Sequence, residues 1–175
     1  MAGRKNKHAY LDDFEKDLNG NYQYRGAHYR YVGTPSRSRA LAVLWLCCGG
    51  GAALAVGAGV LPGATAHAPV WLLLPYMAAL ITALYAVVVL VRLTRGGDPM
   101  RAYIHEQTAQ KLPTLTRVCA LFAVLAAAGQ GSAVFANGAQ MLFGVQGIFI
   151  LLEIFSAAAF TAAAAFSRRM RWEKK

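Results

Sequence analysis

Four long apolar runs constrain the fold of this chain more than any other feature of its sequence. They cover residues 40–61, 69–91, 118–136 and 142–166, and 57% of the whole chain is hydrophobic. At about 1.5 Å per residue, each run as a helix matches the hydrocarbon core of a bilayer, which is about 30 Å thick. The sequence therefore predicts an all-α integral membrane protein with four transmembrane helices, arranged as two hairpins in the lipid bilayer.

The basic residues indicate which segments share one side of the membrane. All 18 Lys and Arg residues lie in 1–39, 92–117 and 168–175, and neither short connection within a hairpin contains one. Because basic residues are enriched in cytoplasmic segments, both termini and the central loop 92–117 are expected in the cytoplasm. We therefore predict a multi-pass protein of the cell membrane, with a cytoplasmic tail over 1–39, a membrane domain over 40–167 and a basic cytoplasmic tail over 168–175.

The N-terminal tail carries two local patterns. Apolar residues at helical spacing over 11–18, followed by Asn19-Gly20, predict a short helix. Alternating side chains on both sides of Gly26-Ala27 predict a β-hairpin with a two-residue turn. In that register four tyrosines share one face: Tyr22, Tyr24, Tyr29 and Tyr31. We expect this face to rest on the headgroup layer or on the chain's own cytoplasmic loop, and the alternative is a docking surface for a partner.

The loop and two of the apolar runs contain local signals for helix geometry. Asp98-Pro99 is a helix start, and the residues up to Pro113 predict a short amphipathic helix along the membrane surface. Pro75 lies within the second run, where proline kinks a helix and frees a carbonyl. In the first run, small residues recur at a spacing that allows two helices to pack closely: Gly49, Ala53 and Gly57.

The two hairpins resemble each other in sequence. A shift of the chain by 78 residues aligns Pro35 with Pro113, Arg39 with Arg117 and Gly51 with Gly129, without a gap. A parallel repeat of two hairpins is an architecture used by some transporters. The alternative is chance similarity between two Ala- and Leu-rich hairpins, and the sequence leaves both interpretations open.

Glu153 is the only charged residue in any of the four runs. A carboxyl group near the middle of a bilayer is stabilised only as the neutral acid or with a partner, and the runs contain no Lys, Arg or His. Gln146 precedes it on the same helical face, and Gln130 lies in the outer half of the third run. These three residues could line a polar path or bond helix to helix. A structural Glu153 would bond a carbonyl freed by Pro75, or a partner subunit.

No motif in the sequence indicates catalysis, a metal site or a cofactor. The three cysteines lie inside apolar runs, and the histidines lack metal-ligand spacing. The net charge of +10 does not indicate nucleic-acid binding, because acidic residues are interleaved with the basic ones near the N-terminus. We favour a non-enzymatic subunit or accessory protein of a membrane assembly, with a membrane-protein partner or a second copy of the chain. The alternative is a small proton-coupled transporter with Glu153 as its protonatable site.

Overall fold

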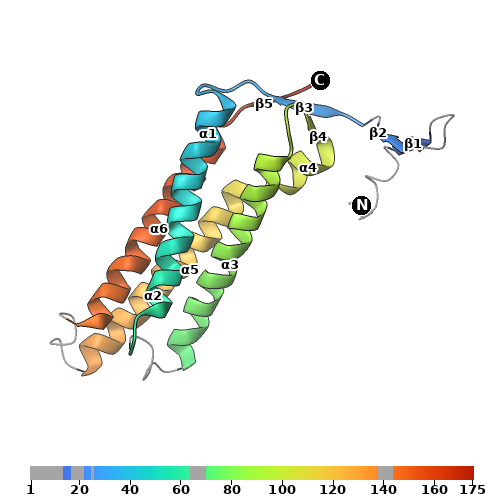
Figure 1. The fold of residues 1–175 in the computed structure, drawn as a ribbon. Helices are drawn as coiled ribbons and strands as arrows, with labels where there is room; N and C mark the ends of the chain where they lie inside the picture. Colours follow the sequence, from blue (N-terminus) through green and yellow to red (C-terminus); the bar gives the residue numbers. More distant parts are fainter. Residues whose placement is uncertain (1–13, 17–21, 25, 64–69, 138–143) are drawn as a thin grey trace, which may run out of the picture.

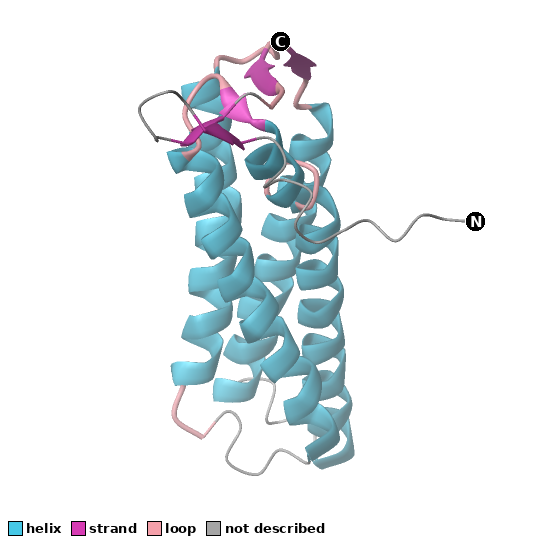
Figure 2. Cartoon of the chain, turned by 90° about the vertical axis from the view of Figure 1, so that its right-hand side faces the viewer, coloured by secondary structure: helices cyan, strands magenta, loops and turns pink. Residues whose placement is uncertain are grey.

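The computed structural model describes residues 14–16, 22–24, 26–63, 70–137 and 144–175. The fold is a bundle of long helices with short strands gathered at one end (Figures 1 and 2). We name the end with the three-stranded sheet and the C-terminus the sheet end, and the opposite end the turn end. Among the described residues, four helices are long and apolar enough to cross a membrane, as the sequence predicted.

The first spanning helix is not uniform. It consists of α1 (Arg37–Leu44), a π-helical segment η2 (Trp45–Gly49) and α2 (Gly50–Val60). The other three are continuous: α3 (Val70–Arg95), α5 (Leu112–Asn137) and α6 (Val145–Arg169). The predicted spans therefore lie within the observed helices to within a few residues.

Glycine, proline and basic residues set several helix boundaries at the sheet end. α3 ends before Gly96-Gly97, and Gly97 has a φ of +70°, which glycine adopts without strain. Pro113 lies in the first turn of α5, where its missing N–H costs nothing. The last turns of α3 and α6 each carry two arginines, which interact favourably with the negative ends of the helix dipoles.

The four spanning helices form a ring in which α6 and α5 are the central pair. α5 packs along α6, α3 packs on α5, and α2 packs on α6, whereas α2 and α3 contact each other much less. Two apolar clusters fill the bundle. The larger one lies toward the sheet end and includes Leu44, Leu90 and Phe160, and the smaller one, toward the turn end, includes Tyr76 and Phe149.

A small sheet joins three distant segments at the sheet end. β3 (His28–Tyr31) lies between β4 (Met100–Arg101) and β5 (Trp172–Lys174), and both pairs are antiparallel. The short helix α4 (Ala102–Gln107) follows β4 directly, so the central loop contains a short helix, but Asp98-Pro99 is not its start because Met100–Arg101 pair with β3 and the N-cap is Arg101. Figure 1 shows β3 and β5 side by side above the helices.

Two predictions for the N-terminal tail are wrong. The tyrosine strands do not form a hairpin, because β2 (Tyr22–Tyr24) pairs with β1 (Phe14–Lys16) while β3 pairs with β4 and β5. An isolated hairpin is marginal in water, and the three-stranded sheet gives β3 a partner on each edge. Residues 14–16 form β1 and not part of a helix, since a helix this short lacks stability of its own. The rest of the predicted helix lies outside the described residues.

Candidate functional site

The candidate site is a layer of polar side chains between the two apolar clusters of the bundle. Glu153, on α6, is fully buried at 0% exposure. Along the same helix, Phe149 belongs to the cluster toward the turn end and Phe160 to the cluster toward the sheet end. The carboxyl group therefore lies inside the bundle, between two apolar layers, and not on the outer face of α6.

Neither carboxyl oxygen of Glu153 has a hydrogen-bond partner in the part of the chain that the structure describes. The predicted hydrogen bond from Glu153 to a backbone carbonyl freed by Pro75 is therefore not present among these residues. Pro75 itself lies inside the continuous helix α3. An unpaired neutral polar group in an apolar interior costs roughly 2 kcal/mol or more, and an ionised carboxylate costs far more. The arrangement thus accommodates Glu153 as the neutral acid.

Two hydroxyl groups near Glu153 connect the neighbouring helices to α2. The Tyr76 hydroxyl, from α3, donates a hydrogen bond to the Ala55 carbonyl oxygen at 3.0 Å. The Ser156 hydroxyl, one turn after Glu153, donates to the Gly51 carbonyl oxygen at 2.9 Å. Tyr76 also lies within electrostatic range of the Glu153 carboxyl. Both hydrogen bonds are accepted by backbone carbonyls of α2, so they join α2 to α3 and to α6 near the buried Glu153.

The sequence pointed to Glu153 but not to Tyr76 or Ser156. Tyr76 follows Pro75 directly, and Ser156 lies three residues after Glu153, which places both serine and acid on one helical face. The three-residue spacing from Glu153 was the only sequence signal for Ser156, and Tyr76 had none beyond its place after Pro75, because serine and tyrosine are common in membrane helices. Of the other predicted polar residues, Gln130 is buried in α5 and Gln146 is half-buried in the first turn of α6.

The predicted small-residue face of the first run points away from the bundle core. Ala53 is exposed, and a Cβ added at Gly57 would meet nothing within 4 Å. The buried small residues of α2 are others, among them Gly51, Ala52 and Ala55. Gly51 lies against the Phe160 ring, where an added Cβ would approach the ring to 3.1 Å. The helix therefore uses one small-residue face internally and leaves a second one outside.

The predicted tyrosine face is divided between two sheets. Tyr29 stacks on His105 of α4, with ring centroids 4.2 Å apart, and Tyr31 contacts Trp172 of β5 edge-on at 5.3 Å. His105 also contacts Trp172, so the rings form one cluster under the sheet. Tyr22 and Tyr24 lie on β2, in the other sheet. The two tyrosines of β3 thus rest on the central loop and the C-terminal strand of their own chain.

Comparison with protein families, characterised proteins and solved structures finds no significant match for this chain.

Proposed function

We propose that this chain is a small proton-coupled membrane transporter in which Glu153 is the protonatable site. The observation that carries the proposal is the buried carboxyl group of Glu153, which has no hydrogen-bond partner among the described residues. Such a group destabilises the bundle. Its location supports a role in proton binding, because an ionisable residue inside a membrane bundle is by default a functional candidate.

The first spanning helix supplies an element that could move when Glu153 changes its charge. π-helical segments within α-helices are frequent at functional sites, and η2 is followed directly by Gly50-Gly51. Glycine lowers the cost of a change in backbone dihedral angles. α2 contacts α3 only lightly, and two hydroxyl bonds join it to its neighbours beside the acid. This half of the helix is therefore the natural moving part.

The electrostatics of the polar layer around Glu153 would couple proton release to the opening of the bundle. With Glu153 neutral, the closed bundle buries no charge and is therefore more stable than with Glu153 ionised. Loss of the proton leaves a carboxylate that needs water or a cation, so the ionised form favours a state in which α2 has separated from α3 and α6. A substrate that binds this open state would be exchanged against a proton. We propose further that the sheet end faces the cytoplasm, since it carries the basic segments.

The test uses purified protein in sealed phospholipid vesicles containing a pH-sensitive dye. A panel of small cations and neutral solutes is added under a pH gradient. We expect solute-dependent proton movement across the vesicle membrane in the wild type and none in Glu153→Gln, because the glutamine side chain has the shape of glutamic acid but cannot release a proton. Thr161→Val is the matched control, because Thr161 lies on the exposed side of the same helix.

A second measurement does not need the substrate. Infrared difference spectra taken between about pH 5 and about pH 9, a range that covers displaced carboxyl groups in proteins, should show a protonated-carboxyl band that disappears in Glu153→Gln. Equal proton movement by wild type and Glu153→Gln would contradict the proposal. A carboxyl band that never responds to pH would also contradict it, since Glu153 would then not exchange its proton.

A non-enzymatic accessory subunit is the second candidate, and the outward small-residue face of α2 supports it. Ala53 and Gly57 would allow a partner helix or a second copy to approach closely. The other two arguments for this role are weaker in the structure, because Glu153 faces inward and Tyr29 and Tyr31 pack on their own chain. Cross-linking of Ala53→Cys, in a chain without its native cysteines, tests it against Thr161→Cys on the exposed side of α6.

A further inference from the structure

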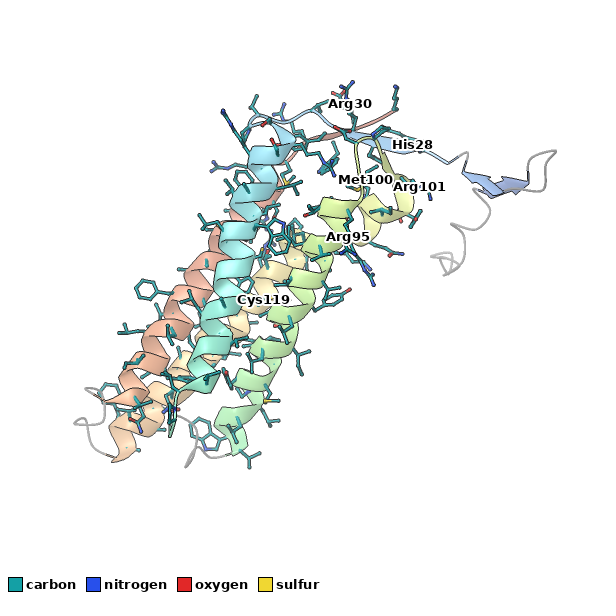
Figure 3. All side chains as sticks on the ribbon, in the orientation of Figure 1. His28, Arg30, Arg95, Met100, Arg101 and Cys119 are labelled. Carbon is teal, nitrogen blue, oxygen red and sulfur yellow. The ribbon has the colours of Figure 1, made fainter. Side chains whose placement is uncertain are left out.

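A cleft of about 320 Å³ opens between the end of α3 and the short helix α4. Arg92, Arg95 and Gly96 form one wall. Residues of α4 and the turn after it form the other: Tyr103, Ile104, Gln107 and Thr108. Both arginine side chains are exposed, and Figure 3 places Arg95 at the end of α3 beside α4. We propose that this cleft binds the headgroup of an acidic glycerophospholipid.

The charge of the cleft favours an anion. Arg92 and Arg95 are three residues apart on one helix, so their guanidinium groups share a face. No carboxylate is among the residues that line the cleft. The C-terminal end of α3 contributes about half a negative charge, which the two full positive charges of the arginines outweigh. Two guanidinium groups can each donate paired hydrogen bonds to the oxygens of a phosphate.

The depth of the cleft matches the headgroup layer. From Val70 to Val91, α3 is roughly 33 Å long, which covers the hydrocarbon core of about 30 Å and leaves Arg92 and Arg95 just beyond it. The indole N–H of Trp45 donates a hydrogen bond to the hydroxyl of Thr94 at 3.1 Å. Tryptophan is enriched at the boundary between hydrocarbon and headgroups, and this contact places the boundary beside the two arginines.

The outer face of α3 offers a continuous track for acyl chains below the arginines. Its exposed apolar residues recur at helical spacing and lead toward Arg92: Ile81, Leu84, Tyr85 and Val88. A lipid whose phosphate binds Arg92 and Arg95 would lay its chains on this stripe. A soluble phosphate compound would use only the cleft. The continuity of the stripe with the arginine pair is therefore the reason to assign the site to a lipid.

The experiment is native mass spectrometry of the full chain released from detergent. Dioleoyl phosphatidylglycerol and dioleoyl phosphatidylcholine are titrated separately, and glycerol phosphate is added as a soluble competitor. We expect one phosphatidylglycerol bound with preference over phosphatidylcholine. Arg92→Gln/Arg95→Gln should lower the affinity about 25-fold, because each basic side chain near an anionic lipid contributes about a fivefold factor. The matched control Arg168→Gln/Arg169→Gln removes two exposed charges from the last turn of α6 and should lower it far less.

Arg92→Lys/Arg95→Lys keeps the charges, and thus the insertion signal, but loses the paired hydrogen bonds. It should show an intermediate loss even where the glutamine variant fails to insert. Equal loss in the two glutamine variants would overturn the proposal, because binding would then follow total charge. Equal binding of the two lipids would overturn it as well. Full displacement of the lipid by glycerol phosphate would assign the cleft to a soluble phosphate compound instead.

Discussion

The two helical hairpins have nearly the same length but are packed in different ways. In the second hairpin α5 and α6 lie against each other along the bundle, whereas in the first α2 and α3 contact each other much less. α2 packs on α6 and α3 packs on α5, so each helix of the first hairpin packs mainly on a helix of the second. The helices of the second are continuous, and the first contains η2 and the Gly49–Gly51 segment. We call the second hairpin the scaffold, because its two helices are continuous and closely packed, whereas the first helix of the other hairpin is interrupted by a π-helical segment.

The polar layer lies where the two hairpins meet. Glu153 and Ser156 belong to the second hairpin, and Tyr76 and the carbonyl acceptors on α2 belong to the first. If the sequence similarity of the hairpins reflects duplication, then the position equivalent to Glu153 in the first hairpin is Pro75. The same depth would then hold a protonatable group in the scaffold and a helix irregularity in its partner. Four predictions test how far this division of roles holds.

The largest effect should follow from truncating the core side chain that joins the hairpins. Phe160→Ala removes a fully buried ring that lies against Gly51, and it should lower the free energy of unfolding by about 3–5 kcal/mol. Denaturation in mixed micelles measures this change. Phe155→Ala, on the exposed side of the same helix, should change it by less than about 0.5 kcal/mol. Similar losses for both variants would contradict the assignment of α6 as the scaffold helix.

The second predicted effect is a gain in stability. Glu153→Met replaces an unpaired buried carboxyl with an apolar side chain of similar length, and it should raise the free energy of unfolding by about 1–3 kcal/mol. Ser156→Ala is the comparison, because it removes a hydrogen bond that is made and should lower stability by about 1 kcal/mol. A Glu153→Met variant that is less stable than the wild type would show that the carboxyl stabilises the bundle.

The third effect concerns the link between α2 and α3. A Cβ at Gly59 would collide with the Tyr76 hydroxyl, so Gly59→Ala should displace it from the Ala55 carbonyl and cost about 1 kcal/mol. Gly57→Ala, two residues away, meets nothing within 4 Å and should stabilise the helix by about 0.5–1 kcal/mol. Thermal unfolding in detergent distinguishes the two. An unchanged unfolding temperature in Gly59→Ala would mean that the hydrogen bond of Tyr76 does not hold α2 and α3 together.

The sequence predicted the spans because length and apolar content alone decide whether a helix can cross a bilayer. It also identified Glu153, since a single charge in an apolar run is conspicuous. It could not show which face of α2 is buried, because small residues occur on both faces of that helix. Nor could it pair β3 with β4 and β5, whose alternation is too short to detect. Strand pairing between segments so far apart depends on how the helices bring them together.

The smallest effect concerns the sheet that joins the hairpins. β3 precedes the first hairpin, β4 lies between the two and β5 follows the second. His105 lies beneath this sheet, outside the apolar part of the spans, where burial lowers its pKa while Glu106 partly opposes the shift. Its Nδ1 atom has no hydrogen-bond partner among the described residues, which also favours the neutral ring. The folded sheet end therefore binds a proton less readily than the unfolded chain, in which the histidine pKa is about 6.5.

Stability of the sheet end should consequently fall as the pH drops through about 6.5, because the unfolded state takes up a proton that the folded state excludes, and it should stay constant above that value. Trp172 contacts His105, so its fluorescence reports local opening once Trp45 and Trp71 are replaced by Phe. His105→Phe keeps an aromatic ring against Tyr29 but cannot titrate, and its signal should be independent of pH. A pH response of equal size in His105→Phe would assign the effect to another group. Loss of the response only in that variant would show that the contact joining the two hairpins is weakened by acid.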